Sequence, residues 1–337
     1  MIRSDHLLEV RNLEVVFPTR EGTVQAVRGV SFTVDAGESL GVVGESGSGK
    51  STLARAALGM IELPGRIAGG EILWRGRSLL DKRVARRIRG REISMVSQDP
   101  MASMSPILTI GTQMTEVMTR HLDIGRREAF TRAGDLLEKV GIPDPGRRLG
   151  QYPFEFSGGM QQRVVIATAL SCDPMMLIAD EPTTALDVTT QAQILELISS
   201  LQKDLGLALV LITHDLGVVA GACDLLKVLY AGEIVESGTA DQLFHRPRHP
   251  YTAALLGSTP RLDVKADRLM AIEGHPPDLR HVGGRCSFTP RCPHATTRCT
   301  TESPVLQPSE AGRAYACWNP LGGREAPELP TARAGHG

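Results

Sequence analysis

The distribution of apolar residues along the chain predicts two kinds of β-sheet. From Leu7 to Val34, short apolar segments alternate with polar residues and are broken by proline and glycine, a pattern typical of an antiparallel β-layer. Further along, apolar runs alternate with helical stretches such as Thr190–Leu205. Because such runs are buried on both faces, they predict a parallel sheet covered by helices. The runs are Met175–Ala179, Ala208–Thr213 and Leu225–Tyr230.

Two changes in local amino-acid composition divide the chain into segments. Residues from about Gln98 to Phe156 are rich in methionine, threonine and helix formers, and they predict a helical insertion. Beyond about Phe244, proline, arginine and cysteine dominate, and the final residues are typical of a disordered tail. We therefore expect a main α/β domain over residues 7–244 that contains the insertion (about 98–156), a small extension over 245–320 and a tail over 321–337.

Composition and charge favour an ordinary soluble protein. The 337 residues are 42% hydrophobic and 22% charged, and 37 Lys and Arg against 38 Asp and Glu leave a net charge of −1. This balance produces no overall field that would attract nucleic acid. No apolar stretch approaches the roughly 18 residues of a membrane span, and Met1–Arg11 lacks the apolar core of a signal peptide. The sequence predicts a cytosolic protein that reaches a membrane only through a partner.

A glycine-rich segment after the apolar stretch Leu40–Val43 indicates the chemistry most directly. It fits the pattern G-x-x-x-x-G-K-[ST], which binds the phosphates of a nucleoside triphosphate. Its glycines let backbone N–H groups approach the phosphates at the positive end of the helix that follows. We expect Lys50 to reach the β- and γ-phosphates and Ser51 to bind Mg²⁺. The predicted ATP-binding residues here are Gly44, Glu45, Ser46, Gly47, Ser48, Gly49, Lys50, Ser51 and Thr52.

Two adjacent acids follow the apolar run Met175–Ala179. A carboxylate at such a strand end can hold Mg²⁺, and the next one can polarise a water molecule toward the γ-phosphate. We therefore assign Asp180 the metal role and Glu181 the role of general base. Alone, two acids before Pro182 would indicate no more than the end of a strand, but a phosphate loop in the same chain favours catalysis.

The segment from Ser157 to Gln161 predicts a second anion site. Ser157 is a good N-cap, and the glycines after it expose bare N–H groups at the positive end of a helix that runs to Leu170. One nucleotide does not need two such sites far apart in one chain. The pair is explained if this segment contacts the γ-phosphate held by another protomer. The segment consists of Ser157, Gly158, Gly159, Met160 and Gln161.

These motifs occur in an order that resembles the nucleotide-binding subunits of ABC transporters. The resemblance covers about residues 7–238. It implies an α/β P-loop NTPase fold with a RecA-like core, an antiparallel β-layer and a helical subdomain. The motifs in order are the phosphate loop, Gln98, Ser157–Gln161, Asp180-Glu181, Ala185-Leu186-Asp187 and His214.

The resemblance implies a role for each remaining residue. Gln98 would bind Mg²⁺, sense the γ-phosphate and respond to the permease, and His214 would be the switch that contacts the γ-phosphate. Asp187 would lie at the interface of two cassettes, and Ser157–Gln161 would be the signature. Phe17 would stack on adenine, although tyrosine is usual there, and Phe156 stands where leucine usually precedes the signature.

Further segments narrow the resemblance to the dipeptide/oligopeptide (and nickel) importer ATPases. They are Asp99–Met101, Glu181–Thr189 and His249–Leu256, while Cys286–Pro293 is similar to the C-terminal extension of those proteins. One departure is visible, since Met104-Ser105-Pro106 replaces the usual Leu-Asn-Pro in the region that meets the permease.

Four of the six cysteines fall in this extension. Clustered thiols in a cytosolic chain suggest a metal more than disulfides, yet their spacing matches neither common zinc patterns nor ferredoxin patterns. Because the extension resembles those for which a [4Fe–4S] cluster has been proposed, a cluster, zinc and free thiols all stay open. Cys172 and Cys223 are expected to be ordinary buried thiols. The candidate ligands are Cys286, Cys292, Cys299 and Cys317.

The function that the resemblance implies is ATP hydrolysis that energises import of peptides or a related small solute. The implied partners are transmembrane permease subunits, a second ATP-binding subunit in a homo- or heterodimer and, indirectly, a solute-binding protein. The location would be peripheral, on the cytoplasmic side of the inner or plasma membrane. No nucleic acid is expected, because the basic stretch Lys82–Arg91 lacks interleaved aromatic residues and is typical of a solvated helix face.

Two alternatives belong to other functional classes. A soluble ABC ATPase that acts on nucleic acid or the ribosome usually carries two cassettes or a long coiled-coil or zinc insertion, and this chain shows one cassette without such an insertion. A non-catalytic nucleotide-sensing regulator is disfavoured by the intact Glu181 and His214.

Overall fold

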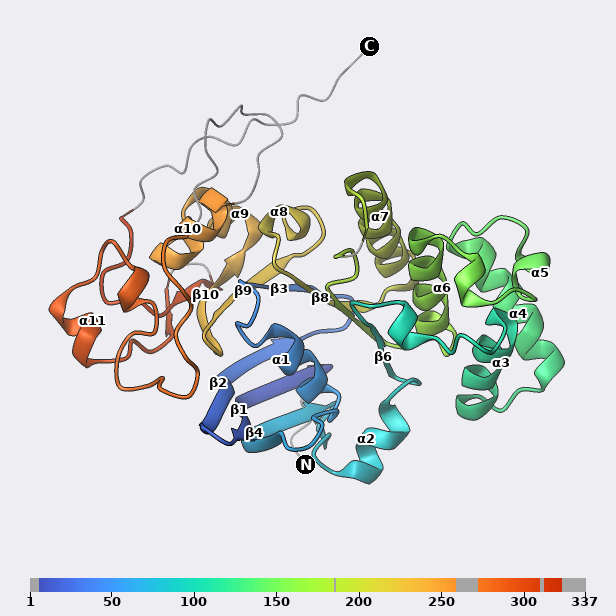
Figure 1. Cartoon of the computed structure of the whole chain (residues 1–337), viewed down its shortest axis with the longest axis horizontal. Coiled ribbons are helices and arrows are strands. Elements are labelled where there is room, and N and C mark those ends of the chain that lie inside the picture. The colour runs from blue at the N-terminus through green and yellow to red at the C-terminus, as the bar shows by residue number, and fades with distance from the viewer. Residues whose placement is uncertain (1–5, 185, 259–271, 310–311, 323–337) are drawn as a thin grey trace, which may run out of the picture.

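The computed structural model describes residues 6–184, 186–258, 272–309 and 312–322. Its strands form a four-stranded antiparallel sheet and an eight-stranded mixed sheet. Helix α1 (Lys50–Ala57) contacts strands of both sheets, so the phosphate loop before it lies where the two sheets meet (Figure 1).

The smaller sheet confirms the antiparallel β-layer predicted for Leu7–Val34. Its strand order is β2-β1-β4-β5. Leu8, Val10 and Trp74 on its inner face are at most 1% exposed, and the buried indole Nε1 of Trp74 donates a hydrogen bond to Glu92 at 2.6 Å. The strands are β1 (Leu8–Thr19), β2 (Gly22–Val34), β4 (Arg66–Trp74) and β5 (Arg77–Ser78).

The larger sheet confirms the predicted parallel sheet. Its order is β11-β12-β10-β9-β3-β8-β7-β6, and the five strands from β9 to β6 run parallel. Every residue of β3, β7 and β8 is buried, as expected for strands covered on both faces. The strands are β3 (Ser39–Val43), β6 (Ile93–Val96), β7 (Met176–Asp180), β8 (Ala208–Thr213), β9 (Leu225–Tyr230), β10 (Glu233–Thr239), β11 (Gln307–Pro308) and β12 (Ala314–Tyr315).

The helices form two groups. Four helices gather at the end of the molecule beyond β6 (Figure 1); three of them lie in the predicted insertion, and the fourth follows it directly. They are α3 (Ile110–His121), α4 (Arg126–Lys139), α5 (Pro145–Arg148) and α6 (Gly158–Leu170). The others are α1, α2 (Lys82–Ile88), α7 (Val188–Leu205), α8 (Leu216–Val219), α9 (Ala240–His245), α10 (Pro250–Ser258) and α11 (Thr297–Thr301), with short 3₁₀ turns at Met101–Ser103, Pro153–Glu155 and Thr289–Arg291. Across the described ranges, no helix combines the length and the apolar character needed to cross a bilayer.

The C-terminal segment, residues 272–309 and 312–322, packs onto the larger sheet. Its strand β12 pairs with β10, and its Phe288 is 2% exposed within the core that includes Tyr230 and Tyr251. The Phe288 ring centroid lies 5.2 Å from that of Tyr230 and 5.4 Å from that of Tyr251. This segment therefore shares an apolar core with the main domain. The part of the predicted tail from residue 323 onward lies outside the described residues.

Candidate nucleotide site

The phosphate loop, Gly44–Ser51, connects β3 to α1, and two of its glycines have no room for a side chain. Gly44 has a φ of +157°, and a Cβ there would lie 2.2 Å from the Leu229 carbonyl oxygen. At Gly49, with a φ of +105°, a Cβ would lie 2.2 Å from the Ala26 carbonyl oxygen. Both positions therefore require glycine. Ser46 and Gly47 at the crest are exposed, whereas Ser48 is buried.

The Lys50 side chain lies inside the loop and is 3% exposed. Its Nζ donates to the carbonyl oxygens of Gly44 at 2.8 Å and Glu45 at 3.0 Å, and lies 3.6 Å from Glu181 Oε1. Burial lowers the pKa of Lys50, and the nearby Glu181 and Asp180 carboxylates oppose that shift. The ammonium is thus placed at the centre of the expected phosphate site.

The two residues assigned to Mg²⁺ are in contact. Ser51 Oγ donates to Asp180 Oδ1 at 2.9 Å. Asp180 is 3% exposed, and burial raises its pKa. A hydroxyl and a carboxylate are oxygen ligands of the kind that Mg²⁺ prefers, with phosphates and water completing its shell. These residues fit the predicted ion, while a contribution from Gln98 stays a prediction.

Glu181 is the centre of a polar group that the sequence places on four separate segments. Its Oε2 accepts from Gln98 Nε2 at 3.3 Å and from Thr184 Oγ1 at 2.9 Å, and lies 3.3 Å from His214 Nδ1. The three predicted catalytic residues are thus brought together next to Lys50. Thr184 was not singled out in the sequence, although its place three residues after Glu181 is a usable signal.

The backbone of Glu181 has a φ of +46°, which is uncommon for a residue other than glycine. Its N–H donates to the Ile212 carbonyl oxygen at 2.9 Å, and this bond anchors it to the end of β8. Unusual backbone angles held by the surrounding structure cluster at functional sites. Glu181 combines this backbone angle with a carboxylate that lies 3.6 Å from Lys50 Nζ.

The signature segment, Ser157–Gln161, begins α6 as predicted. Ser157 Oγ accepts from the Met160 N–H at 3.4 Å, and Gln161 Nε2 donates to the Pro153 and Phe156 carbonyl oxygens at 3.0 and 3.2 Å. Ser157 and Gly158 are exposed. Within the described residues, no hydrogen bond or ion pair joins this segment to the phosphate loop.

The signature segment packs against the start of α7. A Cβ at Gly159 would lie 2.6 Å from Thr190 Cγ2, so glycine permits a close approach of the two helices. Asp187 caps α7 and accepts from the Thr190 N–H at 3.0 Å and its hydroxyl at 2.7 Å. These bonds lower the pKa of Asp187. The structure therefore groups the signature with Asp187.

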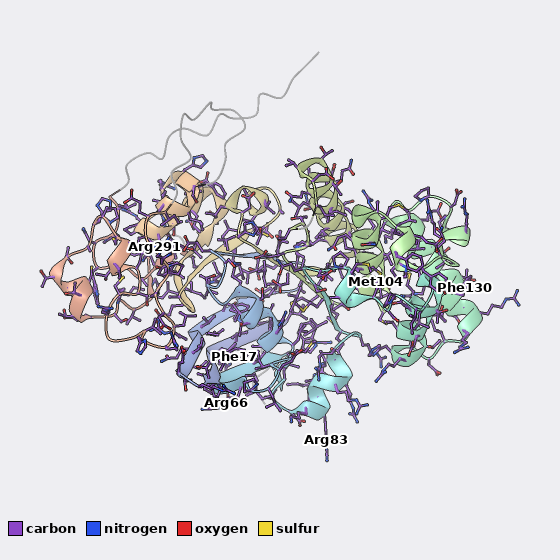
Figure 2. The ribbon with its side chains drawn as sticks, viewed as in Figure 1. Phe17, Arg66, Arg83, Met104, Phe130 and Arg291 are labelled. Atoms are coloured by element: carbon purple, nitrogen blue, oxygen red, sulfur yellow. The ribbon has the colours of Figure 1, made fainter. Side chains whose placement is uncertain are left out.

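Phe17 lies on β1, at the antiparallel sheet (Figure 2). It is half-buried against Gly65, where an added Cβ would be 2.4 Å from the Phe17 ring. Its stacking on adenine stays a prediction. Phe156 is 6% exposed, and the Arg148 guanidinium lies 5.5 Å from its ring centroid.

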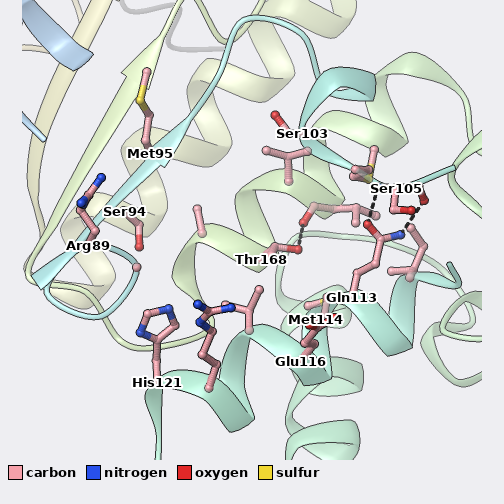
Figure 3. Close-up of a pocket in the computed structure, with 18 of the residues that line it drawn as sticks. Arg89, Ser94, Met95, Ser103, Ser105, Gln113, Met114, Glu116, His121 and Thr168 are labelled. Carbon is pink, nitrogen blue, oxygen red and sulfur yellow. Dashed lines mark hydrogen bonds between the residues drawn. The ribbon is translucent and has the colours of Figure 1, made fainter. Parts of the chain in front are cut away.

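A cavity of about 510 Å³ lies between β6, α3 and α6. Figure 3 shows Arg89 and His121 at one end and Ser105 with Gln113 at the other. Gln113 Oε1 accepts from the Ser105 N–H at 2.8 Å, and its Nε2 donates to the Ser105 carbonyl at 3.1 Å. Met104 also lines the cavity. Met104 and Ser105, which stand where Leu-Asn is usual, thus form part of the cavity wall.

The four cysteines of the C-terminal segment approach one another without forming a ligand set. Burial raises the pKa of Cys286, of Cys292 and, to about 11, of Cys317, and the neighbouring thiols add to these shifts. Cys299 Sγ lies 3.5 Å from the Thr296 N–H that it caps. Among the described residues, no group of three or more His, Cys, Asp or Glu side chains could hold a metal ion. Cys172 and Cys223 are buried, as predicted.

Comparisons with known proteins agree with this geometry. Two family descriptions match, "ABC transporter" over residues 27–184 and "Oligopeptide/dipeptide transporter, C-terminal region" over 235–299. The oligopeptide transport ATP-binding protein OppD of Salmonella typhimurium is 47% identical over 94% of this chain and 94% of its own length. OppD of Bacillus subtilis is 52% identical over 88% and 84%, and the dipeptide transport ATP-binding protein DppD of Bacillus subtilis is 47% identical over 93% and 95%.

Solved structures support the same assignment. The dimeric ATP-binding cassette MJ0796, bound to ADP and Pi, has a TM-score of 0.62 and 27% identity, covering 69% of this chain and 98% of that one. Fold and site together define an ATPase of the ATP-binding cassette class. More narrowly, the chain belongs to the family of oligopeptide and dipeptide transport ATP-binding proteins.

Proposed function

We propose that this chain hydrolyses ATP to energise the import of peptides through an ABC transporter. The observation that carries the ATPase activity is the convergence of Gln98, Lys50 and His214 on the Glu181 carboxylate. The peptide substrate is supported by relatives named for oligopeptide and dipeptide transport that match along nearly the whole chain. Whether the solute is a dipeptide or a longer peptide depends on the permease and the solute-binding protein.

In this proposal the phosphate loop holds the triphosphate and Glu181 accepts a proton from the attacking water. Lys50 leaves the loop carbonyls and pairs with the β- and γ-phosphates. Ser51 and Asp180 would hold Mg²⁺, which would neutralise charge on the phosphate oxygens. Gln98 and His214 orient the Glu181 carboxylate and the γ-phosphate side of the site.

The direct test is transport by the assembled system. Vesicles that contain the chain assembled with its permease and solute-binding protein are expected to take up labelled peptide only when ATP is supplied. Peptide-independent ATP hydrolysis coupled to tight nucleic-acid binding at physiological salt would favour the soluble ABC ATPase instead. Release of no phosphate under any of these conditions would favour a nucleotide-sensing regulator.

We infer that two cassettes complete each other's ATP sites. The exposed signature segment lacks a link to the phosphate loop of its own chain, and the structural relative is described as dimeric. Head-to-tail pairing would place Ser157 and Gly158 of one cassette on the γ-phosphate held by the other, with Asp187 at the interface. The partner cassette is either a second copy or a related subunit.

Ser157→Arg is expected to leave ATP binding by the single cassette unchanged and to lower turnover about tenfold or more, because a bulky cation would fill the facing phosphate site. Phosphate release and nucleotide affinity are measured on the same preparation. Ser200→Arg, on the exposed face of α7, is the control. Full turnover by Ser157→Arg would show that the signature does not complete a second ATP site.

The permease is proposed to contact the cavity beside Met104 and Ser105. This region lies a few residues after Gln98 in the chain, and Gln98 contacts the Glu181 carboxylate. A permease bound there would therefore be linked to the catalytic carboxylate through Gln98. The chain would then be held peripherally at the cytoplasmic side of the membrane by that subunit.

What the four cysteines bind is a separate proposal. The presence of all four cysteines in one segment supports a [4Fe–4S] cluster, whose binding would require the thiols to rearrange into a ligand set; zinc and free thiols are the alternatives. If a cluster forms, anaerobically purified protein is expected to be brown and to contain about four irons per chain. Cys292→Ser should deplete the iron, whereas Cys172→Ser should not. Colourless, metal-free protein with four reactive thiols would leave free thiols as the answer.

A further inference from the structure

One side chain of the C-terminal segment reaches the phosphate loop. Arg291, at the end of the 3₁₀ turn Thr289–Arg291, donates from both terminal nitrogens to the Glu45 carboxylate, at 2.7 and 2.9 Å. The two residues are 246 positions apart in the chain. Paired parallel hydrogen bonds of this kind fix geometry as well as charge.

The guanidinium is buried and its remaining N–H groups are also bonded. The Arg291 side chain is 3% exposed. Its Nε donates to the Glu273 carbonyl at 3.0 Å, and its terminal nitrogens also donate to the Ile272 carbonyl at 3.2 Å and the Tyr230 hydroxyl at 3.4 Å. The Glu45 hydrogen bonds raise the pKa of Arg291 further. Arg291 is therefore held in one orientation, aimed at the loop.

Glu45 is restrained from three directions. Its carboxylate is held by Arg291, its N–H donates to the Tyr251 hydroxyl at 2.8 Å, and its carbonyl accepts from Lys50 Nζ at 3.0 Å. Tyr251 is fully buried on α10, and its ring packs on Phe288 of the C-terminal segment. Two of these three restraints on Glu45, from Arg291 and Tyr251, thus come from elements outside the ATPase motifs.

We propose that Arg291 is a positioning residue of the ATP site, so that the C-terminal segment forms part of that site. This rests on the proposed ATPase function. By pairing with Glu45, Arg291 fixes the loop in the curve that accepts phosphates and neutralises a carboxylate that would otherwise repel them. The site then needs the C-terminal segment to be folded in place. Figure 2 shows Arg291 on the side of the molecule opposite the helical group that carries the signature.

The test compares Arg291→Met with the double variant Arg291→Met/Glu45→Gln. Affinity is measured by calorimetry with a magnesium complex of a non-hydrolysable ATP analogue, and KM and kcat are measured for ATP. We expect the single variant to raise Kd and KM about tenfold, because it leaves an unpaired carboxylate close enough to act on the charge of Lys50 in the phosphate site, with little change in kcat. The double variant removes that carboxylate and should recover the part of the affinity lost to charge repulsion, but not the part lost because the loop is no longer held by Arg291.

The matched control is Arg298→Met. Arg298 lies on α11 of the same segment and pairs with Glu302 at 2.8 Å, but it is exposed and contacts no residue of the phosphate loop in the described structure. The Arg298→Met variant should bind the ATP analogue with the same Kd as the unchanged protein. A single variant with unchanged Kd, or a double variant as weak as the single one, would overturn the proposal.

Two further outcomes separate this proposal from the ATPase function. If the unchanged protein neither binds nor hydrolyses ATP, the ATPase function fails, whereas unchanged binding by Arg291→Met overturns only the positioning role. Should Arg291→Met not fold, Glu45→Gln breaks the same pair from the loop side. It should then speed amide hydrogen exchange in the loop, and unchanged exchange would overturn the proposal.

Discussion

Glu181→Gln is expected to bind ATP as the unchanged protein does and to lose turnover by about 10²- to 10⁴-fold. The amide has nearly the same shape as the carboxylate and can still contact Gln98 and Thr184. It cannot accept a proton from the attacking water. Loss of kcat with retained affinity is the sign of an interaction needed only in the transition state.

The measurement is steady-state phosphate release together with nucleotide affinity on the same sample. Glu196→Gln, an exposed residue of α7, removes a carboxylate of the same type away from the site and should keep full turnover. Near-normal hydrolysis by Glu181→Gln would mean that another group is the base. The nearby His214 would then be the first residue to examine.

The parts of the fold that follow from local pattern were predictable. The runs Ala208–Thr213 and Leu225–Tyr230 have the predicted bounds, since strands between neighbours in a covered sheet are mainly apolar, with Lys227 as the charged residue of the second run. The run beginning at Met175 is displaced by one residue because Asp180, although acidic, pairs with Ile212 within the sheet. The apolar pattern alone cannot show that an acidic residue is the last residue of a strand and not the first residue after it.

The candidate site was predictable for a different reason. Lys50 and Ser51 follow from the loop pattern itself, whereas Gln98 was assigned to the site by the resemblance of motif order. Its contact with Glu181, 83 positions away in the chain, emerges only with the fold. The positive φ of Glu181 carries no glycine or asparagine signal, so it emerges only with the fold. Arg291 could not be assigned at all, because nothing in the sequence couples a turn near the C-terminus to Glu45.

Lys50→Ala is expected to weaken ATP binding by about a hundredfold, since it removes charge-assisted hydrogen bonds to two phosphates, each contributing about 1.5–3 kcal/mol. The two variants differ in the constant that changes: Lys50→Ala should mainly raise Kd and KM, whereas Glu181→Gln should mainly lower kcat. It also removes the ammonium that bridges the Gly44 and Glu45 carbonyls and faces Glu181.

Calorimetry with ATP and Mg²⁺ checks this expectation, and thermal unfolding confirms that the variant is folded. Lys203→Ala, an exposed lysine in the last turn of α7, is the control and should leave Kd unchanged. Lys50→Arg separates charge from shape: the guanidinium keeps the charge but is too large for a side-chain pocket that leaves lysine 3% exposed. It should therefore also bind ATP poorly. Affinity preserved in Lys50→Ala would remove Lys50 from the phosphate site and leave the backbone N–H groups of the loop and α1 as its main source of binding.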